Sequence, residues 1–155
     1  SVKKVAFFNK FIGKKKKIIK NILISLGTAN LDKKTIDFIN NEINSFLKKI
    51  DHKRFNFYLD PSIKIHKASN FKSKIFWANY SSKMYRKVDL SIVKPGLGTI
   101  NDCLQYAIPI ISYSKPFNKE FKFNSKILTD NKLGWSVKNF SSIPEKIDEI
   151  MKNKN

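Results

Sequence analysis

The sequence has little cysteine, little arginine and no long apolar run. Cys103 is the only cysteine, which excludes an internal disulfide framework and a multi-cysteine zinc site and suits a reducing compartment. No run of about 18 apolar residues occurs, so the sequence predicts no membrane-spanning helix. With no apolar leader visible after the first lysines, we expect a cytoplasmic protein. The chain begins at Ser1 instead of methionine, so we expect it to be a piece of a longer protein.

Acidic residues are also scarce. The chain has 31 Lys+Arg against 12 Asp+Glu, a formal net charge of +19, and its only arginines are Arg54 and Arg86. A nucleic-acid reader is expected to use arginine for bidentate base contacts, and the lysines here are spread from Lys3 to Lys154. Abundant Lys, Asn and Ile with little Arg are typical of AT-rich coding drift. We therefore favour coding bias and a solvated surface over a polyanion-binding surface, and we expect no nucleic-acid partner.

The remaining composition is that of one folded domain. Its 155 residues with a 41% hydrophobic fraction suffice for a single core. Residues 1–20 are set apart, because Phe7, Phe8 and Phe11 precede a lysine run at 14–17. This stretch is either an amphipathic element for an anionic membrane surface or an initial strand or linker, which we favour because the apolar run is short. We predict the domain itself over residues 21–155.

From residue 21 onward, short apolar runs alternate with helical patterns. The apolar runs are continuous, which indicates strands buried on both faces of a parallel sheet. The sequence therefore predicts an α/β fold, a doubly wound parallel sheet of about six strands with helices on both faces. We expect strands at 21–26, 55–59, 75–77, 90–93, 108–113 and 135–137, and helices at 32–50, 82–87, 99–106, 119–130 and 142–151.

In such sheets ligands bind beyond the carboxyl ends of the strands, which directs attention to two junctions, Gly27–Thr28 and Lys94–Thr99. Gly96 and Gly98 lack Cβ atoms, so the backbone there can approach a ligand and adopt positive φ. A helix beginning near Thr99 would present free amides to an anion, beside the lysine that opens the turn. The alternative is that the glycines only make a tight turn. The spacing matches neither a Walker A loop nor a GxGxxG fingerprint.

Asp102 lies one turn into this helix. With Thr99 it approximates a capping box, and a carboxylate there is stabilised by the helix amino terminus without any functional reason. The functional interpretation is acceptance of hydrogen bonds from the paired hydroxyls of a ribose beside the phosphate site. Trp77 could likewise stack on a base, although we favour a core aromatic.

Three runs together resemble a known family: ILISLGT (22–28), DLSIVKPGLGTINDCLQYAIPIISY (89–113) and KEFKFNSKILTDNKLGW (119–135). Over about residues 21–151 the chain resembles the C-terminal domain of GT-B-type glycosyltransferases. It is most similar in pattern to the peptidoglycan N-acetylglucosaminyltransferase and monogalactosyldiacylglycerol synthase, within the UDP-glycosyltransferase group. The resemblance implies a Rossmann-like half of a GT-B fold that binds a nucleoside-diphosphate sugar, with uridine as the expected nucleoside.

The resemblance also implies roles for individual residues. Asp102 takes the acidic position at the ribose, where the family usually has the longer Glu. Glu120 takes the position that contacts donor-sugar hydroxyls, with Asn124 as the helix Asn below it, and Phe121 departs from the usual Gln. The catalytic base of the family comes from an N-terminal domain, so catalytic residues here are unknown, and we expect neither a metal nor another cofactor. The implied donor-diphosphate residues are Gly27, Thr28, Lys94, Gly96, Leu97, Gly98 and Thr99.

We therefore predict the donor-binding C-terminal domain of a glycosyltransferase. It would be inactive alone and would need an N-terminal acceptor-binding domain or subunit as its partner. Two alternatives stay open: a sugar-nucleotide hydrolase or epimerase of the same fold, or a nonenzymatic basic module that binds nucleic acid or an anionic membrane.

Overall fold

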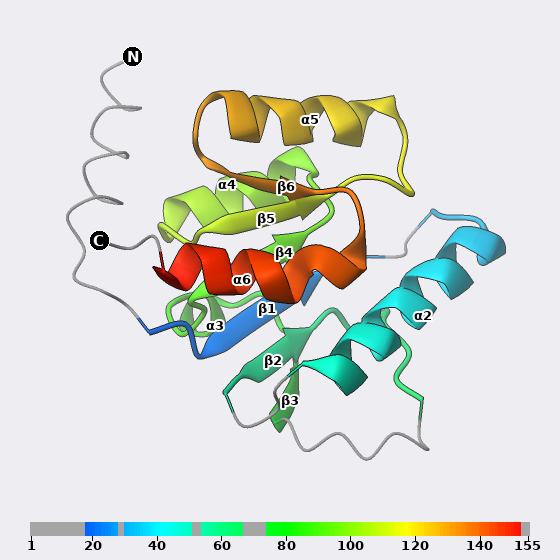
Figure 1. The fold of residues 1–155 in the computed structure, drawn as a ribbon, viewed down its shortest axis with the longest axis horizontal. Helices are drawn as coiled ribbons and strands as arrows, with labels where there is room; N and C mark the ends of the chain where they lie inside the picture. Colours follow the sequence, from blue (N-terminus) through cyan, green and yellow to red (C-terminus); the bar gives the residue numbers. More distant parts are fainter. Residues whose placement is uncertain (1–17, 28–29, 51–53, 67–73, 153–155) are drawn as a thin grey trace.

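The computed structural model describes residues 18–27, 30–50, 54–66 and 74–152 (Figure 1). The segment predicted over residues 1–20 therefore lies outside the described residues except for its last three. Of these, Ile19 is buried, and the Lys20 amide donates a hydrogen bond to the Asp89 carboxylate at 3.0 Å. The elements are β1 (Asn21–Ser25), α2 (Lys33–Lys49), β2 (Asn56–Leu59), β3 (Lys74–Trp77), α3 (Ser82–Tyr85), β4 (Leu90–Val93), α4 (Leu97–Gln105), β5 (Ile110–Tyr113), α5 (Lys119–Asp130), β6 (Gly134–Val137), a 3₁₀ turn (Phe140–Ser142) and α6 (Ile143–Lys152).

The six strands form one parallel sheet in the order β3-β2-β1-β4-β5-β6. The chain starts in the middle at β1, builds outward through β2 to β3, then crosses back to pair β4 with the other edge of β1. This reversal places the topological switch point between β1 and β4. In open α/β sheets ligands bind beyond the carboxyl ends of strands at such a point. The predicted fold class is confirmed.

Helices cover both faces of the sheet, and each face has its own core. On one face Ile22 and Ile24 of β1 pack with residues of α2 and α6, and on the other Leu23 packs with residues of α3, α4 and α5. Successive side chains of a strand point to opposite faces, so a strand covered on both sides must be apolar throughout. This is why β4 and β5 are buried at every position.

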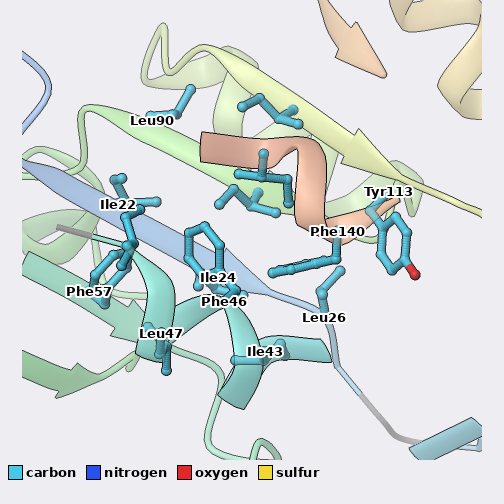
Figure 2. Close-up of a cluster of buried hydrophobic side chains, with 14 of the residues drawn as sticks. Ile22, Ile24, Leu26, Ile43, Phe46, Leu47, Phe57, Leu90, Tyr113 and Phe140 are labelled. Carbon is cyan, nitrogen blue, oxygen red and sulfur yellow. The ribbon is translucent and has the colours of Figure 1, made fainter. Parts of the chain in front are cut away.

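The larger core is built around aromatic rings (Figure 2). Phe46 of α2 contacts Phe57 of β2 edge-on, with ring centroids 5.8 Å apart, and Phe140 at 5.3 Å. Phe140 also packs against Tyr113 of β5 at 5.3 Å. Edge-to-face contacts of this kind add about 0.5–1.5 kcal/mol to the burial of each pair. These aromatic contacts join α2, β2, β5 and the turn before α6 across one face of the sheet.

Helix α2 follows its predicted pattern. The Asp32 side chain accepts a hydrogen bond from the Thr35 amide at 2.9 Å and so caps the first turn.

Within the described residues, no helix combines the length and apolar character needed to cross a membrane.

Gly134 in β6 is a position where only glycine fits. A Cβ added there would lie 2.6 Å from the carbonyl oxygen of Ile110 in β5 and 3.2 Å from the Ile110 Cβ. Because the obstacle is backbone, the two strands would have to separate. We expect Gly134→Ala to lower the free energy of unfolding by about 1–3 kcal/mol, measured by urea denaturation. Gly98→Ala is the matched control, since a Cβ at Gly98 meets nothing within 4 Å; equal effects of the two substitutions would contradict the prediction.

Candidate functional site

The loops after β1 and β4 lie side by side at the switch point. The Lys94 ammonium, in the loop after β4, donates a hydrogen bond to the Gly27 carbonyl, in the loop after β1, at 2.9 Å. Thr28, the other residue predicted at this junction, lies outside the described residues. The lysine therefore connects the two loops that follow β1 and β4.

Helix α4 begins after the loop of Lys94 without a side-chain cap. The sequence predicts a helix from Thr99 and a capping box with Asp102, and both predictions are wrong: α4 starts at Leu97 and its N-cap is Gly96, which has no side chain to donate or accept. The first intrahelical bond runs from the Ile100 amide to the Gly96 carbonyl at 3.0 Å. Three amides of the first turn, those of residues 97–99, therefore have no acceptor among the described residues, and they carry the positive end of the helix dipole.

The backbone conformation of this turn does not require glycine. The sequence allows positive φ at Gly96 and Gly98, but Gly96 has φ −75° and no glycine in the described part of the chain has positive φ. A Cβ at Gly98 would meet nothing within 4 Å, and one at Gly96 would make ordinary contact with the Phe121 ring at 3.6 Å. The fold itself would thus accept side chains here. Gly98 leaves open space in the same turn as the uncapped amides, whereas the position of a Gly96 Cβ is bordered by the Phe121 ring.

Lys94 is held firmly instead of extending into solvent. Its ammonium lies 5.2 Å from the centre of the Phe121 ring and 5.6 Å from that of Phe117, in addition to its bond to Gly27. Partial burial lowers the pKa of Lys94, and the nearby Asp60 carboxylate opposes that shift. The side chain thus adds positive charge beside α4 from a fixed position.

Helix α5 contacts the loop that leads into α4. Asn124 is buried, and its amide nitrogen donates to the Pro95 carbonyl at 2.9 Å, so it holds the loop that leads into α4. Glu120 lies in the exposed first turn of α5, beside Phe121. The two predicted sugar-site residues thus differ in placement, because Glu120 is free to meet a ligand and Asn124 is engaged with the backbone.

Asp102 is exposed on α4, and its Oδ2 accepts a hydrogen bond from the Tyr85 hydroxyl at 3.2 Å. Cys103, the next residue, points the other way and is fully buried, and burial raises the pKa of its thiol to about 11.

The core position favoured for Trp77 is wrong, because this side chain is 54% exposed at the end of the edge strand β3.

A polar cluster at the ends of β1, β2 and β3 was not predicted. The Tyr80 hydroxyl bonds both the Asp60 carboxylate and the Ser25 hydroxyl, and Tyr80 has a positive φ of 55°. Asp60 also accepts bonds from the Ser62 amide at 2.9 Å and from its hydroxyl at 2.5 Å. The only signal in the sequence was the Asp60-Pro61 stop after a strand. The cluster lies next to Gly27, since a Cβ added to this glycine would be in ordinary contact with an Asp60 carboxylate oxygen, at 3.8 Å.

Protonation of Asp60 should weaken the fold. Burial raises the pKa of Asp60, but the hydrogen bonds from Ser62 and Tyr80, with Lys94, outweigh it and lower that pKa below the ordinary 3.8. The unfolded chain then binds the proton more readily, so stability present above about pH 4 is lost as the pH falls through the folded-state pKa. We expect urea denaturation at pH 3–7 to show a shallower acid loss for Asp60→Asn than for wild type. Identical slopes would contradict this.

No family model matches the sequence, and no curated protein matches it significantly. Solved structures do share its fold. The spinosyn rhamnosyltransferase SpnG superposes with a TM-score of 0.63 at 12% identity, covering 91% of this chain and 39% of its own. The glycotransferase of kitacinnamycin gives 0.61 at 11% identity, with 86% and 35% covered. The UDP-GlcNAc 2-epimerase of Methanocaldococcus jannaschii, solved with UDP-GlcNAc and UDP, gives 0.55 at 19% identity, with 100% and 43% covered.

These likenesses show the fold. The sheet and its helices have the Rossmann-like arrangement of a GT-B glycosyltransferase domain, and this epimerase shares it. The chain spans only about two fifths or less of the length of these proteins.

Proposed function

We propose that this chain is the donor-binding domain of a glycosyltransferase and that it binds a nucleoside-diphosphate sugar at the switch point between β1 and β4. The observation that carries the proposal is the uncapped amino terminus of α4, whose first-turn amides have no acceptor among the described residues and lie in the same turn as the open position at Gly98. A helix amino terminus with free amides favours an anion of the size of a phosphate group.

In this proposal the diphosphate accepts hydrogen bonds from the amides of Leu97, Gly98 and Thr99, within the field of Lys94. Gly27, whose carbonyl accepts a hydrogen bond from Lys94, lies beside it, and Thr28 is assigned to the diphosphate on the family resemblance alone. Asp102, one turn along α4, receives the ribose hydroxyls. The distal sugar extends toward the first turn of α5, where Glu120 can accept hydrogen bonds, while Asn124 acts indirectly through the Pro95 carbonyl.

UDP-sugar is the donor we propose, on the resemblance to the peptidoglycan N-acetylglucosaminyltransferase group. The acceptor site and the catalytic base belong in this proposal to an N-terminal domain or subunit, because the chain covers only 35–39% of the glycosyltransferase chains above. The same proposal places the enzyme in the cytoplasm. Peripheral contact with an anionic membrane is also part of the proposal, and flotation with phosphatidylglycerol vesicles tests whether the net charge of +19 leads to it.

Calorimetric titration with UDP tests the binding proposal. We expect saturable binding that Asp102→Ala weakens at least about tenfold, since a charge-assisted hydrogen bond contributes roughly 1.5–3 kcal/mol. Asp130→Ala is the matched control, because it removes the same charge from an exposed position at the far end of α5. Absence of UDP binding, or equal losses in the two variants, would contradict the proposal. Salt-sensitive binding of duplex DNA that Asp102→Ala leaves unchanged would instead support the nonenzymatic basic module.

An epimerase or hydrolase is the second candidate, favoured by the superposition of the epimerase over the whole of this chain. An activity assay on the full-length enzyme that this proposal implies distinguishes a transferase from the second candidate. Incubated with UDP-GlcNAc and no acceptor, a transferase should leave the donor essentially intact. An epimerase would produce the C2 epimer, and a hydrolase would release free sugar.

A further inference from the structure

The Asp102 carboxylate lies on the exposed side of α4, and a hydrogen bond from Tyr85 of α3 restricts its orientation. A side chain on the solvent side of a helix samples several rotamers, and fixing it on ligand binding costs free energy. Asp102 is exposed, yet one of its oxygens is already bonded to the Tyr85 hydroxyl at 3.2 Å.

Tyr85 is itself immobilised. Its side chain is buried, 4% exposed, in the core on this face of the sheet. Its ring stacks on that of Tyr106, with centroids 5.1 Å apart and planes 10° from parallel. Tyr106, which ends α4, bonds through its hydroxyl to the Ser82 hydroxyl of α3 at 2.7 Å. The donor that orients Asp102 is therefore anchored to both helices.

The Tyr85 hydroxyl stays protonated at neutral pH. Burial raises its pKa, and the neighbouring Asp102 charge raises it further. It therefore acts as a donor to the carboxylate throughout the physiological range. One bond to Oδ2 leaves about three lone-pair sites of the carboxylate, two on Oδ1 and one on Oδ2, without a partner among the described residues, which is enough for two further donors.

We propose that Tyr85 is a positioning residue that holds the Asp102 carboxylate ready for both hydroxyls of a ribose, so that the site selects ribonucleotides over 2′-deoxyribonucleotides. The inference rests on the proposed function, and it narrows the ligand to a class. A ribose diol offers two adjacent donors to this carboxylate, whereas a 2′-deoxyribose offers one and so makes one hydrogen bond to the charged group fewer.

The test is calorimetric titration of the 155-residue chain with UDP and with 2′-deoxy-UDP. Wild type should prefer UDP by about tenfold, as expected for one lost hydrogen bond to a charged group. Tyr85→Phe keeps the ring and its stacking but removes the donor, and it should reduce this preference at least about threefold, mainly by weakening UDP. Tyr58→Phe is the matched control, because it removes the hydroxyl of another partly buried tyrosine, whose ring stacks on Phe76 and takes no part in anchoring Tyr85; its preference should equal that of wild type.

The double variant Tyr85→Phe/Asp102→Asn completes the cycle. If Tyr85 acts through Asp102, Tyr85→Phe should have no further effect on the preference once Asp102 is changed. An effect of Tyr85→Phe on the preference that persists in the Asp102→Asn background would overturn the inference. Equal weakening of UDP and 2′-deoxy-UDP by Tyr85→Phe would also overturn it, because a merely structural role weakens the binding of both. Failure of wild type to bind UDP would overturn the proposed function itself. UDP binding with no preference over 2′-deoxy-UDP, or with a preference that Tyr85→Phe leaves unchanged, would overturn only this inference.

Discussion

Replacing Phe46 with alanine is expected to lower the free energy of unfolding by about 3–5 kcal/mol, a large part of the stability of a domain of this size. Phe46 is 3% exposed and lies between the rings of Phe57 and Phe140. Truncation would leave a cavity flanked by two aromatic edges that belong to different elements. The sheet is rigid on one side of this cavity, so we expect little collapse to refill it.

Phe38 provides the control on the same helix. Phe38→Ala makes the same changes in side-chain size and helix propensity as Phe46→Ala. Because Phe38 is 43% exposed, its truncation leaves no closed cavity. We expect it to cost less than about 1 kcal/mol. Urea denaturation followed by circular dichroism measures both variants. Comparable losses for Phe46→Ala and Phe38→Ala would show that α2 does not pack on the sheet as described.

Gly98→Asp is expected to change stability and nucleotide affinity in opposite directions. Gly98 lies in the first turn of α4 with open space at its missing Cβ. An aspartate there replaces a poor helix former and complements the helix dipole, so it should stabilise the fold by about 0.5–1 kcal/mol. The same carboxylate occupies the place proposed for the diphosphate. Like charges about 5 Å apart repel by roughly 3 kcal/mol at an effective dielectric of 20, so UDP affinity should fall at least about 30-fold.

Two controls separate charge, size and site. Asn41→Asp makes the same change in net charge at an exposed position of α2, on the opposite face of the sheet, and should leave UDP affinity within about twofold. Gly98→Ala adds the Cβ alone and measures the steric share. Thermal unfolding and calorimetry are run on each variant. Unchanged affinity in Gly98→Asp would remove the amino terminus of α4 from the binding site.

The order of elements was predictable because it depends on local pattern. Leu90–Val93 is apolar at nearly every position and buried at all of them, as a strand covered on both faces requires. The face of α2 was equally readable, since Ile39, Ile43 and Phe46 recur at helical spacing and Asp32 precedes them as a cap. The start of α4 was predicted two residues too late, because Gly96 caps the helix with no side chain from which a cap could be recognised.

Interactions between distant residues could not be predicted in this way. Lys94 has the appearance of a free phosphate ligand in the sequence, whereas the fold brings its ammonium to the carbonyl of Gly27, 67 positions away, and next to two phenylalanine rings. Asn124, interpreted as a sugar contact, is engaged by Pro95. The hydroxyl of Tyr85 reaches Asp102 only because α3 and α4 pack on the same face of the sheet.

The sequence by itself determined the succession of strands and helices, the apolar faces and the glycine turn at the end of β4, because each depends on side-chain size and polarity within a few neighbouring residues. Only the tertiary structure decided which polar groups are already satisfied and which remain open. Hydrogen bonds between loops depend on the crossing order β3-β2-β1-β4-β5-β6, which places the ends of β1 and β4 together. The amides of the first turn of α4 remain open to a ligand because no side chain in the described part of the chain caps them.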